Sequence, residues 1–126
     1  HINIIYEKIF KKYGLQRGQF AFITRIVENK NINLKQLAQN IRVDKATVTK
    51  AMQKLEESGY VIKKIDQTDN RIIHLLPTEK CTRIYTCIIQ EKNQLLSSII
   101  NKFTSKELEL YISITRDINI CLDKIR

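Results

Sequence analysis

The chain has 126 residues, of which 43% are apolar, and it carries a formal net charge of +9 at pH 7. A chain of this length and composition can bury a hydrophobic core, which excludes an intrinsically disordered protein. No apolar run approaches the roughly 18 residues of a membrane-spanning helix, and no signal-peptide pattern opens the sequence. We therefore expect a cytoplasmic protein with no membrane partner, and the positive charge favours a polyanionic one.

Two amphipathic helices are predicted at the start of the chain. Apolar residues recur at helical spacing over residues 2–13, up to Gly14, and again over residues 19–29. Ile32 is the candidate for a short strand before the next helix. Four aromatic side chains of this region either line a ligand pocket or belong to the core, and the sequence leaves both interpretations open: Tyr6, Phe10, Tyr13 and Phe22.

Residues 33–59 predict two short helices joined by a tight corner, which is a helix-turn-helix. The first helix opens with a capping box, in which Asn33 and Gln36 bond to each other's backbone N–H groups. Asp44 caps the second helix, and Gly59 follows its end as a stop signal. Apolar residues lie at helical spacing in both helices, so each helix buries one face.

The second of these helices has a polar face suited to a DNA major groove. Val48, Ala51, Met52 and Leu55 form its buried side. Its other side carries short hydroxyls, an amide and cations, which are the groups that contact base edges and phosphates. These candidate DNA-binding residues are Lys45, Thr47, Thr49, Lys50, Gln53 and Lys54.

A β-hairpin is predicted directly after the helix-turn-helix. Two runs rich in β-branched residues, 60–66 and 71–77, flank a polar turn at residues 67–70. A hairpin in this position is a wing. The sequence therefore predicts a winged helix-turn-helix over residues 15–77.

Two further helices complete the chain and favour a homodimer. The first runs over residues 78–102, and a capping box between Thr104 and Glu107 opens the second. Apolar positions in the last helix approach a heptad seam: Leu108, Tyr111, Thr115, Ile118, Leu122 and Ile125. The winged helix is complete without these stripes, so we expect residues 1–14 and 78–126 to bury them against a second copy.

The fold class that follows is mainly α with a small β-hairpin (α+β). A single domain combines the winged helix-turn-helix with dimerisation helices from both termini. A two-fold axis would relate two recognition helices, so the operator should be a pseudo-palindrome with half-sites roughly 34–36 Å apart.

The residues resemble the MarR family of bacterial transcription regulators over nearly the whole chain. The matching pieces, in order, are Leu37-Ala38, Thr47-Val48-Thr49-Lys50, Leu55-Glu56 with Gly59, and Asp66-x-x-Asp69-x-Arg71 in the wing. The resemblance implies a homodimeric transcription regulator that binds double-stranded DNA, and we expect it to be a repressor. It also implies a small-molecule effector, of unknown identity, bound between the dimer helices and the winged helix.

Roles follow for the candidate residues, from side-chain chemistry in the helix and from the resemblance in the wing. Thr47, Thr49, Lys50 and Gln53 would contact base edges and nearby phosphates, and Lys45 and Lys54 would neutralise phosphates. In the wing, the carboxylates of Asp66 and Asp69 would hold Arg71 so that its guanidinium enters the minor groove. Basic residues on the DNA backbone complete the set: Lys63 and Lys64 in the wing, with Lys35 and Arg42 in support.

Two stretches depart from the family pattern. Arg42 stands where the corner often has Gly, so the backbone there must avoid positive φ or carry strain. Residues 77–81 stand where Leu-Thr-x-x-Gly is usual, which affects the helix junctions more than the DNA contacts.

Two other classes of function remain open. A winged helix can act as a protein–protein interaction module, with its basic face against an acidic partner, which predicts little sequence preference for DNA. The chain can also be a non-specific nucleic-acid-binding accessory protein whose affinity follows net charge. That reading predicts no effect of Thr49→Ala.

Catalysis, metal binding and a cofactor are disfavoured. The sequence has no P-loop, no G-x-G-x-x-G and no H-E-x-x-H, and its three Gly leave little for a phosphate-binding loop. No Cys/His cluster has metal-ligand spacing, and His74 is expected to be a polar residue at a strand edge. Cys81, Cys87 and Cys121 are expected to be reduced, and buried apolar filler is favoured over a thiol sensor.

Overall fold

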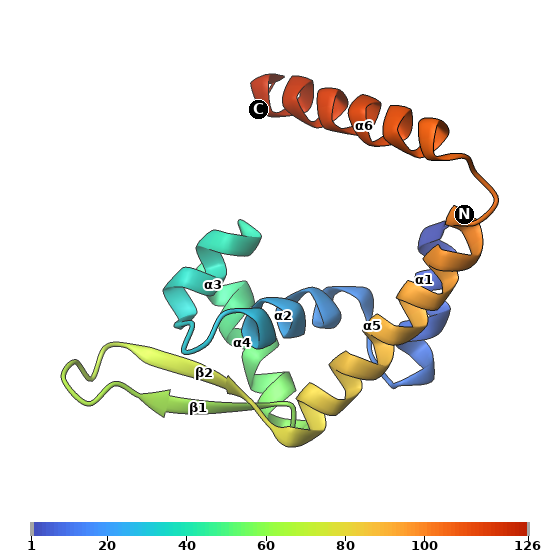
Figure 1. Cartoon of the computed structure of the whole chain (residues 1–126). Helices are drawn as coiled ribbons and strands as arrows, with labels where there is room; N and C mark the ends of the chain where they lie inside the picture. The colour runs from blue at the N-terminus through green and yellow to red at the C-terminus, as the bar shows by residue number, and fades with distance from the viewer. Residues whose placement is uncertain (1, 126) are drawn as a thin grey trace. The chain divides into compact units, whose positions relative to one another are not determined.

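The computed structural model describes residues 2–125, with side chains described from Ile4 on. Helices and one hairpin follow each other in the order α1 (Ile2–Lys12), α2 (Arg17–Glu28), α3 (Leu34–Ile41), α4 (Lys45–Glu57), β1 (Val61–Ile65), β2 (Ile73–Pro77), α5 (Glu79–Ile100) and α6 (Ser105–Ile125) (Figure 1). The predicted class, mainly α with a small hairpin, is confirmed.

The chain divides into two compact units, with the boundary inside α5 between Glu91 and Lys92. The first unit contains the helix-turn-helix, the hairpin and the buried hydrophobic core. The second unit contains the end of α5 and the whole of α6.

Local capping explains where most helices begin. The Asn33 side chain accepts a hydrogen bond from the Gln36 N–H at 2.8 Å, and the Gln36 amide oxygen accepts from the Asn33 N–H at 3.0 Å. The same reciprocal pair joins Thr104 and Glu107 before α6. Both predicted capping boxes are therefore confirmed.

The second helix begins earlier than predicted, at Arg17 rather than Gln19. The Gln19 side chain accepts a hydrogen bond from the Gln16 backbone N–H at 2.9 Å. This bond satisfies a donor that the first turn of a helix leaves unpaired, so the helix starts at Arg17.

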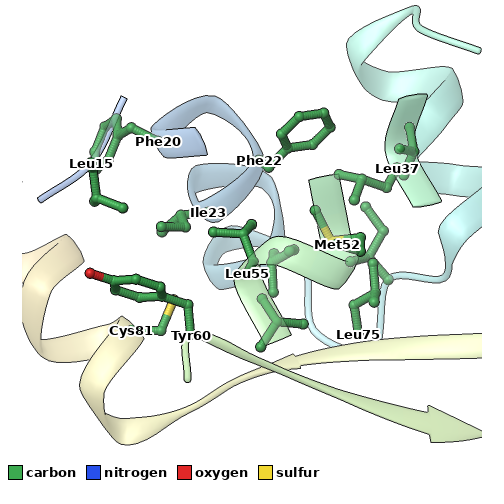
Figure 2. Packing of buried hydrophobic residues seen from close by; sticks show 14 of the residues in the cluster. Leu15, Phe20, Phe22, Ile23, Leu37, Met52, Leu55, Tyr60, Leu75 and Cys81 are labelled. Carbon is green, nitrogen blue, oxygen red and sulfur yellow. The ribbon is translucent and has the colours of Figure 1, made fainter. Parts of the chain in front are cut away.

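The core of the first unit lies where α2, α3, α4, the hairpin and α5 meet (Figure 2). Ile23, Leu37, Met52, Leu55 and Leu75 are each at most 1% exposed, and they come from α2, α3, α4 and β2. Their full burial is the main source of stability here, at roughly 1.5–3 kcal/mol for each large side chain.

The sequence did not decide whether four aromatic residues belong to the core or line a pocket, and two of them belong to the core. Phe10 of α1 and Phe22 of α2 are buried. Tyr6 and Tyr13 are half-buried and pack against the same core. The apolar stripe of α1 is therefore partly covered by its own unit, while Ile4 and Ile5 stay exposed.

The hairpin differs from its predicted boundaries at the tip. β1 and β2 pair antiparallel, with Lys64 opposite His74 and Ile65 opposite Ile73. The predicted second strand began at Arg71, but the loop extends to Ile72 because the Ile72 N–H donates to the Asp69 carbonyl at 3.0 Å. The turn therefore consumes the first two residues of the expected strand.

The expected strand at Ile32 is reduced to a single β-bridge between Asn33 and His74. Beside it, the Leu75 N–H donates to the Ile32 carbonyl at 2.8 Å. These contacts attach the hairpin to the segment that enters α3.

The α6 helix buries none of its described side chains. Its exposed apolar residues are Leu110, Tyr111, Ile112, Ile114, Ile118, Ile120, Leu122 and Ile125. Among the described residues, no helix is long and apolar enough to cross a membrane.

The corner between α3 and α4 has a positive φ at Arg42, the strained alternative of the two that the sequence allowed. Arg42 adopts φ 60° and ψ 45°, the left-handed conformation that a glycine adopts without penalty. The turn is closed by a hydrogen bond of 3.2 Å from the Val43 N–H to the Ala38 carbonyl. Arg42 therefore carries backbone strain at this corner.

Replacing Arg42 with Gly should raise the free energy of unfolding by about 0.5–1 kcal/mol. Relief of the left-handed strain, roughly 1–2 kcal/mol, exceeds the added flexibility of glycine in the unfolded chain. Urea unfolding at fixed protein concentration measures the change. Arg42→Ala is the matched control, because it removes the same charge and keeps the strain. Equal stability of the two variants would contradict a strained corner.

Candidate nucleic-acid interface

A cleft of about 1140 Å³ lies between α3, the corner and the wing loop. Four cations from separate segments line it: Lys35 of α3, Arg42 of the corner, Lys45 of α4 and Arg71 of the loop. Asp69 is the one acid among the described lining residues, and it is paired with Arg71. A concave surface lined by one sign of charge concentrates the electrostatic potential and attracts anions.

The six predicted residues of α4 are all exposed, and Lys45 among them lines the cleft. Their common orientation follows from the opposite face of the helix, where Val48, Met52 and Leu55 are buried. Within the described chain, none of the three lysines on this face has a carboxylate within ion-pair distance. These ammonium groups are available to an external anion.

The hydroxyl groups on this face already use their hydrogens within the helix. Thr49 Oγ1 donates to the Lys45 carbonyl at 2.8 Å, and Thr47 Oγ1 donates to the cap residue Asp44. The hydrogen bond from Thr47 also lowers the pKa of Asp44. Both threonines therefore present acceptor lone pairs and methyl groups outward.

The wing loop is organised by two carboxylates. Asp66 Oδ2 accepts hydrogen bonds from the backbone N–H groups of Thr68 and Asp69, at 3.0 and 3.1 Å. Asp69 holds the guanidinium of Arg71 at two points, from Nε at 3.1 Å and from Nη2 at 3.2 Å. Arg71 lowers the pKa of Asp69, while its own side chain stays 90% exposed. Asp69 therefore holds the arginine directly, whereas Asp66 holds the backbone of the loop and does not contact Arg71.

The two wing lysines lie in different surroundings. Lys63 forms an ion pair of 3.2 Å with Glu56 near the end of α4 and is half-buried. Lys64 is exposed, because successive residues of a strand point to opposite faces. Of the pair, Lys64 has its charge free for a polyanion.

His74 makes contacts that the sequence reasoning missed. Its Nδ1 lies 2.8 Å from the Asn31 carbonyl oxygen, and its Nε2 lies 2.8 Å from Asp66 Oδ1. The hydrogen bond to Asp66 raises the pKa of His74. In the observed register Asp66 is the diagonal neighbour of His74, so the strand register would have pointed to this contact.

The cysteines divide by burial. Cys81 lies in the core, where burial raises the pKa of its thiol to about 11, so it is buried filler as predicted. Cys87 is half-buried, and Cys121 is exposed on α6. The expectation of buried filler is wrong for Cys121, because α6 buries no described side chain. No group of three or more described His, Cys, Asp or Glu residues could hold a metal ion.

Comparison with known proteins identifies the family. The model of the MarR family matches residues 15–73. The chain is 37% identical over 100 residues to the uncharacterised HTH-type transcriptional regulator YybA of Bacillus subtilis, covering 79% of this chain and 67% of that protein.

Solved structures agree. A MarR protein from Peptoclostridium difficile is 40% identical, with a TM-score of 0.80, over 98% of this chain and 80% of that one. Streptococcus pneumoniae FabT, solved in complex with DNA, shares the fold with a TM-score of 0.84 at 19% identity, over 90% of this chain and 79% of that one.

The matched family and the named relatives are transcription regulators, so the expectation that this chain is not an enzyme is confirmed. The chain belongs to the MarR family of winged helix-turn-helix, DNA-binding transcription regulators.

Proposed function

We propose that the protein is a sequence-specific repressor that binds a pseudo-palindromic operator as a homodimer. The observation that carries this proposal is the cleft in which Lys35, Arg42, Lys45 and Arg71 meet beside the exposed polar face of α4. The complex of FabT with DNA supports it, because that protein has the same fold.

In this proposal α4 lies in the major groove and divides its contacts by chemistry. Thr47 and Thr49 accept hydrogen bonds from the amino groups of adenine or cytosine, and their methyl groups pack on thymine methyls. Lys50 and Gln53 reach base edges or nearby phosphates. Lys54 neutralises a phosphate, which adds affinity and salt dependence but no sequence preference.

The cleft would hold one strand of the DNA backbone between the helix-turn-helix and the wing. Lys35, Arg42 and Lys45 face the phosphates from the α3–α4 side. From the wing, Arg71 enters the minor groove and Lys64 contacts the backbone. Lys63 would reach a phosphate by leaving Glu56, so its net contribution is smaller than that of Lys64.

A second copy of the chain would cover the apolar face of α6. An apolar surface that runs along a whole exposed helix marks an interaction site. A symmetric dimer buries the same face of both copies and places two α4 helices on one side of the DNA.

The proposed regulation is release of the operator by a small molecule. Such a ligand must bind one arrangement of the two recognition helices better than the other, because equal affinity shifts nothing. Release of a bound operator duplex supplies the screen for such a ligand.

Fluorescence anisotropy with the DNA upstream of the protein's own gene tests the proposal. A shuffled duplex of the same composition serves as control, and both are titrated at two salt concentrations. We expect the natural duplex to bind at least about 10³-fold more tightly, since specific sites exceed random DNA by that margin. Equal binding to both duplexes that vanishes with salt would leave a non-specific basic surface. No binding to either would favour a protein–protein module.

Arg71→Ala should weaken operator binding by about 1–3 kcal/mol, because it removes a specific arginine contact. Anisotropy measures the affinity against the operator and the shuffled duplex. Arg83→Ala is the matched control, since Arg83 is exposed on α5 and lies outside the cleft. Unchanged operator affinity of Arg71→Ala would remove the wing arginine from the interface.

Ile118→Glu should shift the protein toward monomer and weaken operator binding. The substitution puts a charge into the proposed seam of α6, where Ile118 is 52% exposed in the single chain. Ser113→Glu adds the same charge to α6 away from the seam and should leave the dimer intact. Analytical ultracentrifugation reports the mass of each variant. Dimers of equal stability in both would place the interface elsewhere.

A further inference from the structure

His74 lies between two hydrogen-bond acceptors. Its Nδ1 faces the Asn31 carbonyl oxygen and its Nε2 faces the Asp66 carboxylate, each at 2.8 Å. A neutral imidazole has one N–H and can donate to only one of them, whereas an imidazolium donates to both. The geometry therefore fits the protonated ring.

The charges around the ring favour the same state. The hydrogen bond to Asp66 is the main cause that raises the pKa of His74, followed by the bond to the Asn31 carbonyl. Lys64, its cross-strand neighbour on β1, acts in the opposite direction. The ring is about a quarter exposed, so solvent screens each of these effects.

One side of the ring is attached to the helix-turn-helix. Asn31 precedes α3 by three residues and has φ 61°, a left-handed conformation that Asn tolerates. The neighbouring bond from the Leu75 N–H to the Ile32 carbonyl holds this segment against β2. The Asn31 carbonyl is therefore a fixed acceptor.

The other side of the ring is attached to the wing arginine through two carboxylates. Asp66 uses Oδ1 for His74 and Oδ2 for the backbone N–H groups of Thr68 and Asp69. Asp69 then holds the Arg71 guanidinium. These contacts therefore connect the helix-turn-helix, through His74, to Arg71, the residue proposed for the minor groove.

We propose that His74 is a positioning residue for the wing. As an imidazolium it ties the wing loop to the start of α3, fixes Asp66, Asp69 and Arg71 in their binding arrangement, and makes operator binding take up a proton. This inference rests on the proposed function for its effect on DNA. The bridge itself, which consists of the contacts of His74 with Asn31 and Asp66, is a property of the free protein.

The direction of the pH dependence follows from linkage. A histidine whose pKa is raised in the folded state keeps both contacts below its ordinary value of about 6.5, and loses them as pH rises through the raised value. Nearby DNA phosphates favour the cation as well. Operator affinity should therefore fall as pH increases through the pKa of His74, by at most about tenfold per pH unit for one linked proton.

The bridge is tested first without DNA. The chain has two histidines, so an NMR titration shows two ring signals. The signal that disappears in His74→Gln is that of His74. We expect a His74 pKa above that of a free histidine, with the amide signals of Thr68 and Asp69 shifting at the same pH. In His74→Gln these amide shifts should disappear. A His74 pKa at or below about 6.5, or amides that do not follow it, overturns the proposal.

The effect on DNA is tested by operator affinity between pH 5.5 and 8.5 at constant ionic strength. The wild type should lose affinity across the measured His74 pKa, whereas His74→Gln, which cannot titrate, should show no loss in that interval. Parallel profiles for the two proteins overturn the positioning role. If neither protein distinguishes the operator from the shuffled duplex, the proposed function fails. The NMR titration then still decides whether the bridge exists.

Discussion

The rotation of α4 about its axis is the constraint on which the interface depends. Val48, Met52 and Leu55 are each at most 1% exposed, and they lock one side of the helix into the core. A residue that faces the core cannot face DNA, so this burial decides which side chains point outward. The threonines and lysines of the outer face owe their common direction to hydrophobic packing on the opposite side.

The basic cleft is a product of folding rather than of any one segment. Lys35 and Arg71 are separated by most of the helix-turn-helix and the hairpin, yet they line the same concavity. The bonds between β2 and the segment before α3 bring them there. The strained corner also contributes to the charge of the cleft. Arg42 places a cation there, whereas a glycine, which fits the same backbone without strain, would add no charge.

The sequence predicted the elements and their order because each has a strong local signal. The capping boxes at Asn33 and Thr104 and the stop at Gly59 act within a few residues, and the structure follows them. The register of the hairpin lacks such a signal. The predicted limits would pair Asp66 with Arg71, and in the same register Lys63 with His74. The structure instead pairs Lys64 with His74, which is a shift of one residue. A slip of one residue exchanges the faces of a strand.

That slip explains why the contacts of His74 were missed. With the predicted limits, His74 would stand opposite Lys63, and nothing would relate it to Asp66. The four cations of the cleft were all named from the sequence, but their meeting in one place depends on long-range contacts that no local pattern encodes. The exposure of Cys121 was missed because an apolar stripe predicts that a helix face can be buried but does not show what covers it.

The bare surface of α6 has a consequence for how the protein responds to its own abundance. Helices in water depend on packing for most of their stability, and α6 buries no described side chain within one chain. If a second copy covers it, helix formation and association become one equilibrium, so the active species grows with the square of the protomer concentration. Occupancy of a regulated site would then rise more steeply than protein supply. A cell could switch such a site by a modest change in synthesis or turnover alone.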